Sequence, residues 1–218
     1  MSAPTITQTE YNSLQRAYDA FNKSLFGGTL PQVLITLQRH AHSIGYFSPR
    51  RFAGRTGEVY THELALNPDH FMNCTDKEIL DTLVHEMCHV WQETHGETPR
   101  RGYHNTRWAA KMEEVGLMPS STGEPGGRRT GQRMSNYVIS GGAFENVCDR
   151  LLASGLTINW QDACGGAKDR KRKAASKTKF TCPDCGQNAW AKETASLLCG
   201  YCAVNKGAKR LVLMTPNA

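Results

Sequence analysis

The chain has 218 residues, of which 39% are hydrophobic, and it carries a formal net charge of +6. No stretch approaches the roughly 18 apolar residues that a membrane-spanning helix needs, so the composition excludes a transmembrane protein. The first residues have neither the basic nor the apolar region of a secretory signal, which predicts a cytoplasmic protein. Residues 1–120 have a net charge of −2 and residues 121–218 a net charge of +8. This asymmetry predicts that the C-terminal half contacts phosphate.

One helix and three short strands are predicted in the first third of the chain. Apolar residues recur at helical spacing over 9–25, and the sequence FGGTLP then ends that helix. The segment QVLITLQ, residues 32–38, alternates in the way that is typical of a strand. Two further strands are expected at 43–48 and 61–68, on either side of the turn-rich segment 49–58. These elements favour an α+β fold.

The strongest helix prediction covers residues 76–94. Thr75 and Glu78 form the pattern of a capping box at its start. On a helical wheel the apolar residues of this segment share one arc, and His85 and His89 lie together on the roughly opposite face. The two imidazoles are therefore expected to point into a cleft and not into the core.

A second helix is predicted at 105–115, with Asn105 as its N-cap and Gly116 as its stop. Segment 120–133 is rich in Gly, Ser and Arg, which indicates a loop. The pattern that follows predicts a strand, a helix and a strand, at 136–140, 143–155 and 156–160.

His85, Glu86 and His89 form the pattern H-E-x-x-H. Histidines at i and i+4 can bind one Zn²⁺ from the same face of a helix. Glu86 would lie beside the open coordination position, where it can take a proton from an activated water and return it to a leaving amine. The pattern thus predicts a catalytic zinc, with Glu86 as the acid/base of a peptidase. The simpler alternative is two surface histidines on an ordinary amphipathic helix.

A catalytic zinc needs a third protein ligand, and three residues are candidates. His95 has the metzincin spacing, but that motif requires Gly where this chain has Gln92, and a continuing helix would carry His95 about 9 Å further along its axis. Glu113 only flanks the apolar face of the second helix. His104 lies beside that apolar face, at the helix start, where the chain has turned back. His104 is therefore favoured, and Glu113 and His95 remain alternatives.

Four of the eight cysteines form two C-x-x-C pairs with 13 residues between them: Cys182, Cys185, Cys199 and Cys202. Two such knuckles can close a tetrahedral four-thiolate site that has no free ligand position. We therefore predict a second, structural zinc in a zinc ribbon. A redox role, the alternative for a single C-x-x-C, is not favoured by two pairs. The remaining cysteines are expected to be free thiols: Cys74, Cys88, Cys148 and Cys164.

A run of basic residues precedes the ribbon and is opposed only by Asp169: Lys168, Arg170, Lys171, Arg172, Lys173, Lys177 and Lys179. Such a run is either a solvated linker or a phosphate-contacting segment, assisted by Trp190 or Tyr201 stacking on bases. Nothing in the run encodes sequence specificity.

The sequence HEMCHVWQETHGETPRRGYHNTRWAAKMEEVGL resembles the SprT-like zinc metalloproteases, a family that includes the DNA-dependent protease Spartan. TGQRMSNYVISGGAFE and the C-terminal ribbon resemble bacterial and mobile-element members. The resemblance implies that His85, His89 and His104 are zinc ligands and that Glu86 is catalytic. Asn105 replaces the usual Gly of H-G-x-x-[FW], and Trp108 occupies the aromatic position. Because relatives act on DNA-bound proteins, the resemblance also implies DNA as a partner.

The expected organisation is a zincin-like domain with a minimal three-stranded sheet at 8–120, a strand–helix–strand extension at 121–164, a basic linker at 165–179 and a ribbon at 180–205. The expected function is zinc-dependent hydrolysis of peptide bonds in DNA-associated or DNA-crosslinked proteins. Tyr137, Tyr103 and Arg107 are candidates for stabilising the oxyanion. The alternative function is non-enzymatic nucleic-acid binding through the ribbon and linker, with the front domain as a scaffold.

Overall fold

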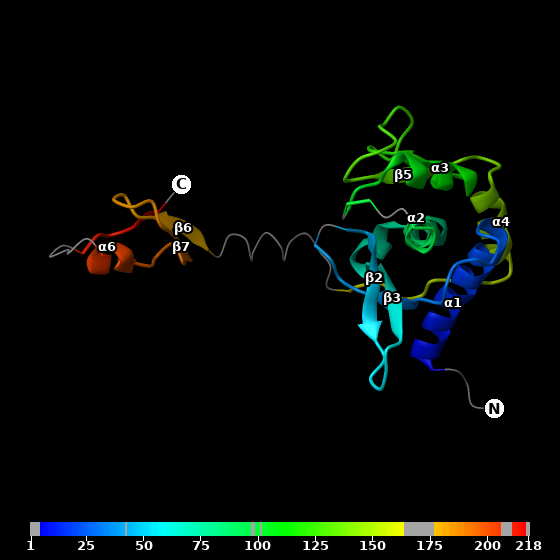
Figure 1. Cartoon of the computed structure of the whole chain (residues 1–218), viewed down its shortest axis with the longest axis horizontal. Coiled ribbons are helices and arrows are strands. Elements are labelled where there is room, and N and C mark those ends of the chain that lie inside the picture. Colours follow the sequence, from blue (N-terminus) through cyan, green and yellow to red (C-terminus); the bar gives the residue numbers. More distant parts are fainter. Residues whose placement is uncertain are drawn as a thin grey trace. The chain divides into compact units, whose positions relative to one another are not determined.

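The computed structural model describes residues 5–41, 43–96, 99–100, 102–163, 177–205 and 211–216 (Figure 1). The chain divides into two compact units, Met1–Ala163 and Cys164–Ala218. Both units mix helices with small sheets, so the fold is mixed α and β. No helix within the described ranges is both long and apolar enough to cross a membrane.

The first unit is built on a three-stranded sheet of β1 (Leu34–Leu37), β2 (Gly45–Ala53) and β3 (Tyr60–Leu66) in the order β1-β3-β2. β1 runs parallel to the central strand β3, and β2 runs antiparallel to it. Strand β2 continues into the segment expected to be a turn, because an irregularity in its pairing with β3 between Ser48 and Phe52 accommodates the extra residues. Arg50 lies at this irregularity with a φ of 50°.

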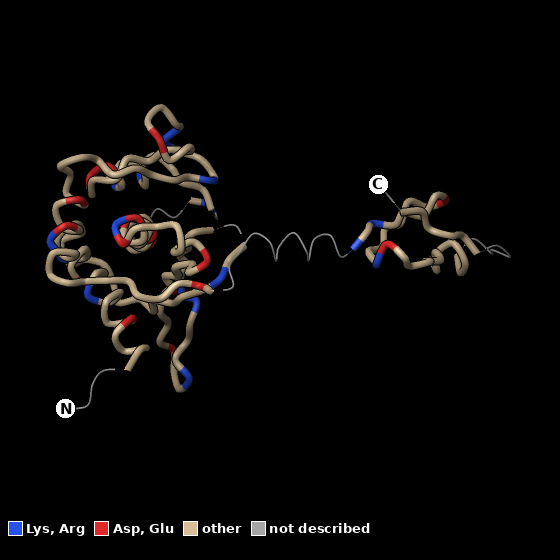
Figure 2. The backbone as a smooth tube through the Cα atoms, turned by 180° about the vertical axis from the view of Figure 1, so that it is seen from behind, with Lys and Arg blue, Asp and Glu red and all other residues tan. Residues whose placement is uncertain are grey.

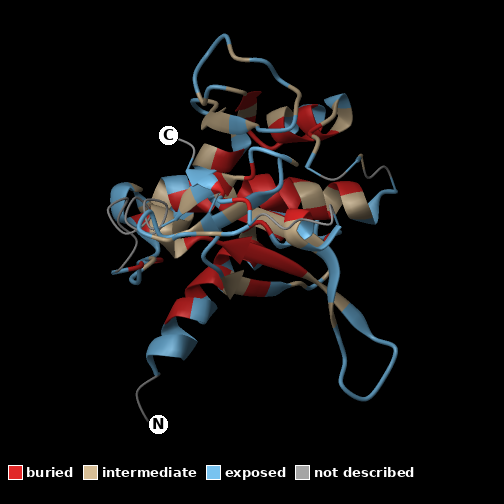
Figure 3. Ribbon diagram, turned by 90° about the vertical axis from the view of Figure 1, so that its left-hand side faces the viewer, coloured by how far each residue is buried: buried red, intermediate tan, exposed pale blue. Residues whose placement is uncertain are grey.

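Helices cover one face of the sheet. α1 (Ile6–Leu25) and the central helix α2 (Asp76–Thr94) lie near the predicted bounds, and a short 3₁₀ helix, η1 (Pro68–Asn73), precedes α2. The predicted capping box is present: Thr75 and Glu78 each bond the other's backbone N–H. Figure 3 shows the buried positions of the helices and sheet in red and the exposed tip of the β2–β3 hairpin in pale blue.

Helices α3 (Thr106–Glu114) and α4 (Ala143–Ala153) complete the core of the first unit. Asn105 caps α3 as predicted, since its side chain accepts the Trp108 backbone N–H at 3.0 Å. Phe21 of α1 stacks on Phe144 of α4 with ring centroids 5.5 Å apart. The α4 segment, expected to belong to an extension, thus shares one core with α1, α2 and α3.

The structure differs from the sequence prediction at two further places. β4 (Leu117–Ser120), which was not predicted, pairs antiparallel with β5 (Ser135–Val138). The predicted strand 156–160 does not form. Side-chain carboxylates take two of its backbone donors instead: the Ile158 N–H bonds Asp76 at 3.4 Å, and the Asn159 N–H bonds Glu10 at 3.2 Å.

The second unit holds β6 (Thr178–Thr181), β7 (Asn188–Ala191), α6 (Gly200–Asn205) and β8 (Thr215–Pro216), with strand order β7-β6-β8. Its small core contains Phe180, Val212 and Met214 beside three buried cysteines. The basic residues Lys168, Arg170, Lys171, Arg172 and Lys173 lie outside the described residues, whereas Lys177 and Lys179 lie inside them. In Figure 2, basic and acidic positions are interspersed over the first unit.

Candidate metal centres

Helix α2 carries His85 and His89 one turn apart, as the H-E-x-x-H spacing predicts. The side chains are not on an exposed face, because the chain returns over α2: His85 is buried, and His89 is partly buried. Trp108 of α3 covers both rings, with centroids 4.9 Å from His85 and 5.5 Å from His89. The alternative of two ordinary surface histidines therefore does not describe this site.

His104 lies two residues before α3, and its backbone is held in place by two hydrogen bonds to Gly131. The His104 N–H donates to the Gly131 carbonyl at 2.8 Å, and the Gly131 N–H donates back at 3.0 Å. This bridge, with the Trp108 ring centred 4.3 Å from the imidazole, directs His104 toward the two histidines of α2.

The three imidazoles converge through their Nε2 atoms. His104 Nε2 lies 3.3 Å from His85 Nε2 and 3.1 Å from His89 Nε2. Zinc–nitrogen bonds of about 2.0–2.1 Å at tetrahedral angles place ligand nitrogens about 3.3–3.4 Å apart. The spacing of the imidazoles therefore fits three corners of a zinc tetrahedron, and the three residues form a potential metal-binding group.

Hydrogen bonds at the opposite ring nitrogens favour the tautomer that a metal needs. His85 Nδ1 lies 3.0 Å from Asn136 Oδ1, and His104 Nδ1 lies 3.1 Å from the Gly131 carbonyl oxygen. Both oxygens are acceptors, so each Nδ1 carries the proton and each Nε2 keeps its lone pair. Both partners lie beyond residue 130, and the sequence reasoning assigned neither of them a role.

Burial keeps the three histidines neutral. It lowers the pKa of His85 to about 4, an effect that the neighbouring His104 strengthens and the Asn136 hydrogen bond opposes. Burial also lowers the pKa of His89 well below its ordinary value, and it lowers the pKa of His104. Neutral imidazole is the form that binds a metal, so protons compete weakly for this group near neutral pH.

Glu86 is buried beside the start of β2, where a backbone N–H meets its carboxyl group. Burial raises the pKa of Glu86 to about 8, and the hydrogen bond from the Phe47 N–H opposes that rise. Gly45 allows β2 to approach α2 closely, since a Cβ at this position would lie 3.0 Å from Thr82 Cγ2 and 3.3 Å from Glu86 Cγ. A divalent cation nearby would favour the ionised form of Glu86, which is the form that accepts a proton.

The other candidate ligands are engaged elsewhere. His95 ends α2, where its backbone N–H donates to the Trp91 carbonyl oxygen at 3.0 Å and its Nδ1 lies 2.8 Å from the same oxygen. Glu113 forms an ion pair with Arg129. Within the described ranges, the histidine group that could hold a metal contains His104 and neither His95 nor Glu113.

Gln92, the residue at the metzincin glycine position, has a structural partner that the sequence did not reveal. Its side chain is buried at the end of α2, and its Nε2 donates to Asn105 Oδ1 at 2.7 Å. Asn105 is the N-cap of α3 and directly follows His104. The Gln92–Asn105 hydrogen bond therefore ties α2 to α3 next to the histidine group.

The three oxyanion candidates remain predictions. The Arg107 guanidinium lies over the Trp91 ring at 5.2 Å, and the Arg100 guanidinium lies over the Tyr103 ring at 4.9 Å. Tyr137 is half-buried on β5, next to Asn136. None of these contacts joins its residue to the histidine group.

The four predicted ribbon cysteines also converge. Cys182 Sγ lies 3.8 Å from Cys202 Sγ, and Cys185 Sγ lies 3.5 Å from Cys199 Sγ. Zinc–sulfur bonds of about 2.3 Å give tetrahedral edges of about 3.8 Å, so the cluster fits zinc. Burial raises the pKa of Cys182, but backbone N–H groups of Cys185 and Asp184 donate to its sulfur and bring the pKa down to about 7.

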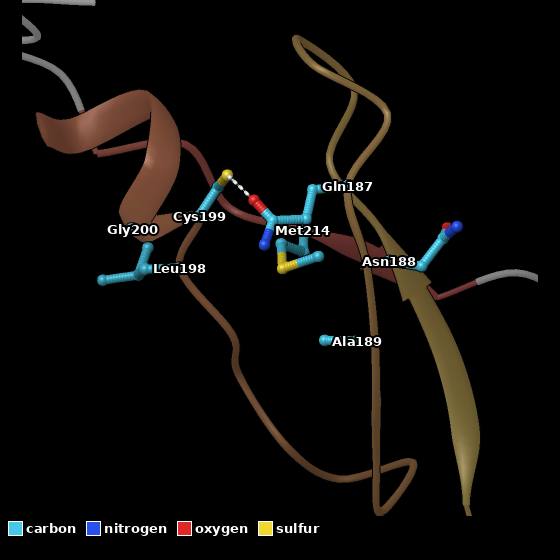
Figure 4. Close-up of a pocket in the computed structure, with 7 residues that line it drawn as sticks. All are labelled: Gln187, Asn188, Ala189, Leu198, Cys199, Gly200 and Met214. Carbon is cyan, nitrogen blue, oxygen red and sulfur yellow. Dashed lines mark hydrogen bonds between the residues drawn. The ribbon is translucent and has the colours of Figure 1, made fainter. Parts of the chain in front are cut away.

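A small pocket adjoins this cluster on the second unit (Figure 4). The Gln187 side chain points toward Cys199, with Oε1 3.9 Å from Sγ, and Met214 lies beside them. The pocket borders the four-cysteine cluster, and a tetrahedral ion held by all four sulfurs would have no ligand position open to a substrate.

Both geometries together define a protein with two potential metal centres, one made of histidines and one made of cysteines. The family model described as the SprT-like family matches residues 14–125, just over half of the chain, and the chain belongs to that family. The chain is also 55% identical over 58 residues to a Salmonella typhimurium protein described only as an uncharacterized protein in the mucB 3′ region. That similarity covers 27% of this chain and 78% of the relative.

Proposed function

We propose that the protein is a zinc-dependent endopeptidase with a zincin-like catalytic domain. The observation that carries this proposal is the convergence of three neutral imidazoles on one point, with Glu86 next to His85 on the same helix. A zinc ion held by His85, His89 and His104 would polarise the scissile carbonyl and lower the pKa of the attacking water.

Glu86 performs the proton transfers in this proposal. Its carboxylate takes a proton from the attacking water and gives it to the leaving amine nitrogen, so the carboxylate is regenerated. Its burial suits this exchange, because a carboxyl group that binds a proton readily can also hold one between the two steps. Burial raises the pKa of Glu86, and the Phe47 N–H opposes that rise, which favours the carboxylate form that takes the proton.

The second zinc of the proposal is structural. Cys182, Cys185, Cys199 and Cys202 would hold it in a closed four-thiolate site that stabilises a unit with a small apolar core. No catalytic step is assigned to this site.

We also propose that the substrates are proteins bound or crosslinked to DNA, with the basic linker and the second unit contacting the nucleic acid. Lys179 is paired with Trp190 across β6 and β7, which places both side chains on the same face of the sheet. Trp190 is 62% exposed, and an exposed aromatic ring beside Lys can stack on a base while the ammonium group contacts phosphate. Family resemblance provides the argument for DNA.

The test compares the wild type with Glu86→Gln on a DNA-binding protein, with and without DNA. Glu86→Gln keeps the shape of the side chain and leaves the histidines intact, so it should retain metal and lose cleavage. Equal cleavage by both proteins, or no cleavage by the wild type under any DNA condition, contradicts the enzymatic proposal. No cleavage together with retained DNA binding would favour a non-enzymatic nucleic-acid-binding protein.

A further inference from the structure

Part of the chain beyond the matched family region reaches the histidine group. The family match ends at residue 125, whereas Gly131 and Asn136 contact His104 and His85. Asn136 lies on β5, where its backbone pairs with Pro119 of β4. The β4–β5 pair thus fixes the backbone from which the Asn136 side chain extends toward α2.

The carbonyl oxygen and the NH₂ group of the Asn136 side chain each face a different residue of α2. Its Oδ1 lies 3.0 Å from His85 Nδ1. Asp81 lies one turn before His85 on α2; burial raises the pKa of its carboxyl group to about 7, and a hydrogen bond with the Asn136 side chain opposes that rise. A hydrogen bond that opposes the rise in the pKa of a carboxyl group is one that the ionised form accepts, so the Asn136 NH₂ group faces Asp81. The amide oxygen is then left to accept the His85 Nδ1 proton. The arrangement is a chain of hydrogen bonds from carboxylate to amide to imidazole.

This chain of hydrogen bonds has a direction that suits metal binding. It keeps the proton of His85 on Nδ1 and leaves the Nε2 lone pair facing His89 and His104. It also restricts the rotation of the ring, because the Asn136 side chain extends from a strand whose backbone is paired with β4. Partners of this kind typically change metal affinity by about 10–100-fold when they are removed.

We propose that Asn136 is a positioning residue for His85, and that Asp81 acts on the same ring through the Asn136 amide. The segment that follows the matched family region then contributes a residue that orients a metal ligand. This inference rests on the proposed zinc site at the three histidines.

The first test measures zinc affinity of the full chain by competition with a chelator. Asn136→Ala should bind zinc at the histidine group about 10–100-fold more weakly than the wild type. Ser135→Ala is the matched control, because Ser135 is the exposed neighbour on the same strand, and it should leave the affinity unchanged. The ribbon zinc is an internal reference that should remain the same in every variant.

An exchange of the two side chains separates positioning from general stability. Asp81→Asn combined with Asn136→Asp keeps an amide next to a carboxylate and presents a carboxylate oxygen directly to His85 Nδ1. This double variant should recover zinc affinity to within a few-fold of the wild type, whereas Asn136→Leu should not. Failure of the exchange to restore affinity would overturn the assigned role.

The outcomes also distinguish this inference from the proposed function. If the wild type binds zinc only at the ribbon, both the histidine site and the role of Asn136 are refuted. If the wild type binds two zinc ions and Asn136→Ala binds both with unchanged affinity, only the role of Asn136 is refuted. A lower melting temperature without a change in affinity would assign Asn136 to folding alone.

Discussion

The hydrogen bond between Gln92 and Asn105 should stabilise the first unit by a measurable coupling energy. Gln92→Met keeps most of the side-chain volume but removes the amide that donates to Asn105. It should lower the free energy of unfolding by about 1 kcal/mol. Asn105→Ala removes the same bond and also the cap of α3, at about 2 kcal/mol together. In the double variant the shared bond is lost only once, so the costs should total about 2 kcal/mol and not about 3 kcal/mol.

The assay is urea unfolding of the four proteins in excess zinc, followed by tryptophan fluorescence. Trp91 and Trp108 are close to this bond and report on the first unit. Gln15→Met is a control on α1, since its amide bonds Asp19 at the surface, and it should cost only a few tenths of a kcal/mol. Additive losses in the double variant would refute the inference that this bond ties α2 to α3.

Three further results are expected. Leu83→Ala, at a fully buried position of α2, should lower the free energy of unfolding in urea by about 2–5 kcal/mol. A loss below about 1 kcal/mol would contradict the core described for the first unit. His104→Ala should lose one of two zinc ions by elemental analysis, whereas His95→Ala should keep both, and the reverse result would reassign the third ligand. Zinc bound at the histidine group should persist at pH 6 and be released as the pH falls toward 4, as measured by zinc content after dialysis. Burial lowers the pKa of His85 to about 4 in the folded chain, below the ordinary value of 6.5 that applies to the unfolded chain. Neutral His85 therefore contributes to the stability of the fold above pH 6.5, and this contribution is lost as the pH falls from 6.5 through the folded pKa of about 4. Release centred between pH 6 and 7 would contradict the described burial of the histidines.

The features that could be predicted from the sequence are those that depend on local spacing. His85 and His89 share a helix face because they are four residues apart, and the Thr75 capping box fixes where that helix begins. Gln92 in place of glycine argued against His95, and the structure places His95 at the end of α2 with its ring nitrogen near the Trp91 carbonyl oxygen.

The features that could not be predicted depend on pairing between distant segments. Asn136 reaches His85 only because β5 pairs with β4, and β4 is a strand of four residues that contains Pro119, so it could not be recognised from the sequence. Segment 156–160 has the composition of a strand, but carboxylates from α1 and α2 accept the N–H groups of Ile158 and Asn159. Neither interaction leaves a periodic signal in the sequence.

In the proposed function, the histidine group holds a zinc ion that acts with Glu86 in peptide hydrolysis. The most direct measurement is the zinc content and the peptidase activity of the same preparations of wild type and Glu86→Gln. We expect two zinc ions per chain in both proteins, and cleavage of a DNA-bound protein by the wild type alone. One zinc ion per chain in the wild type, or equal cleavage by the two proteins, would contradict the claim.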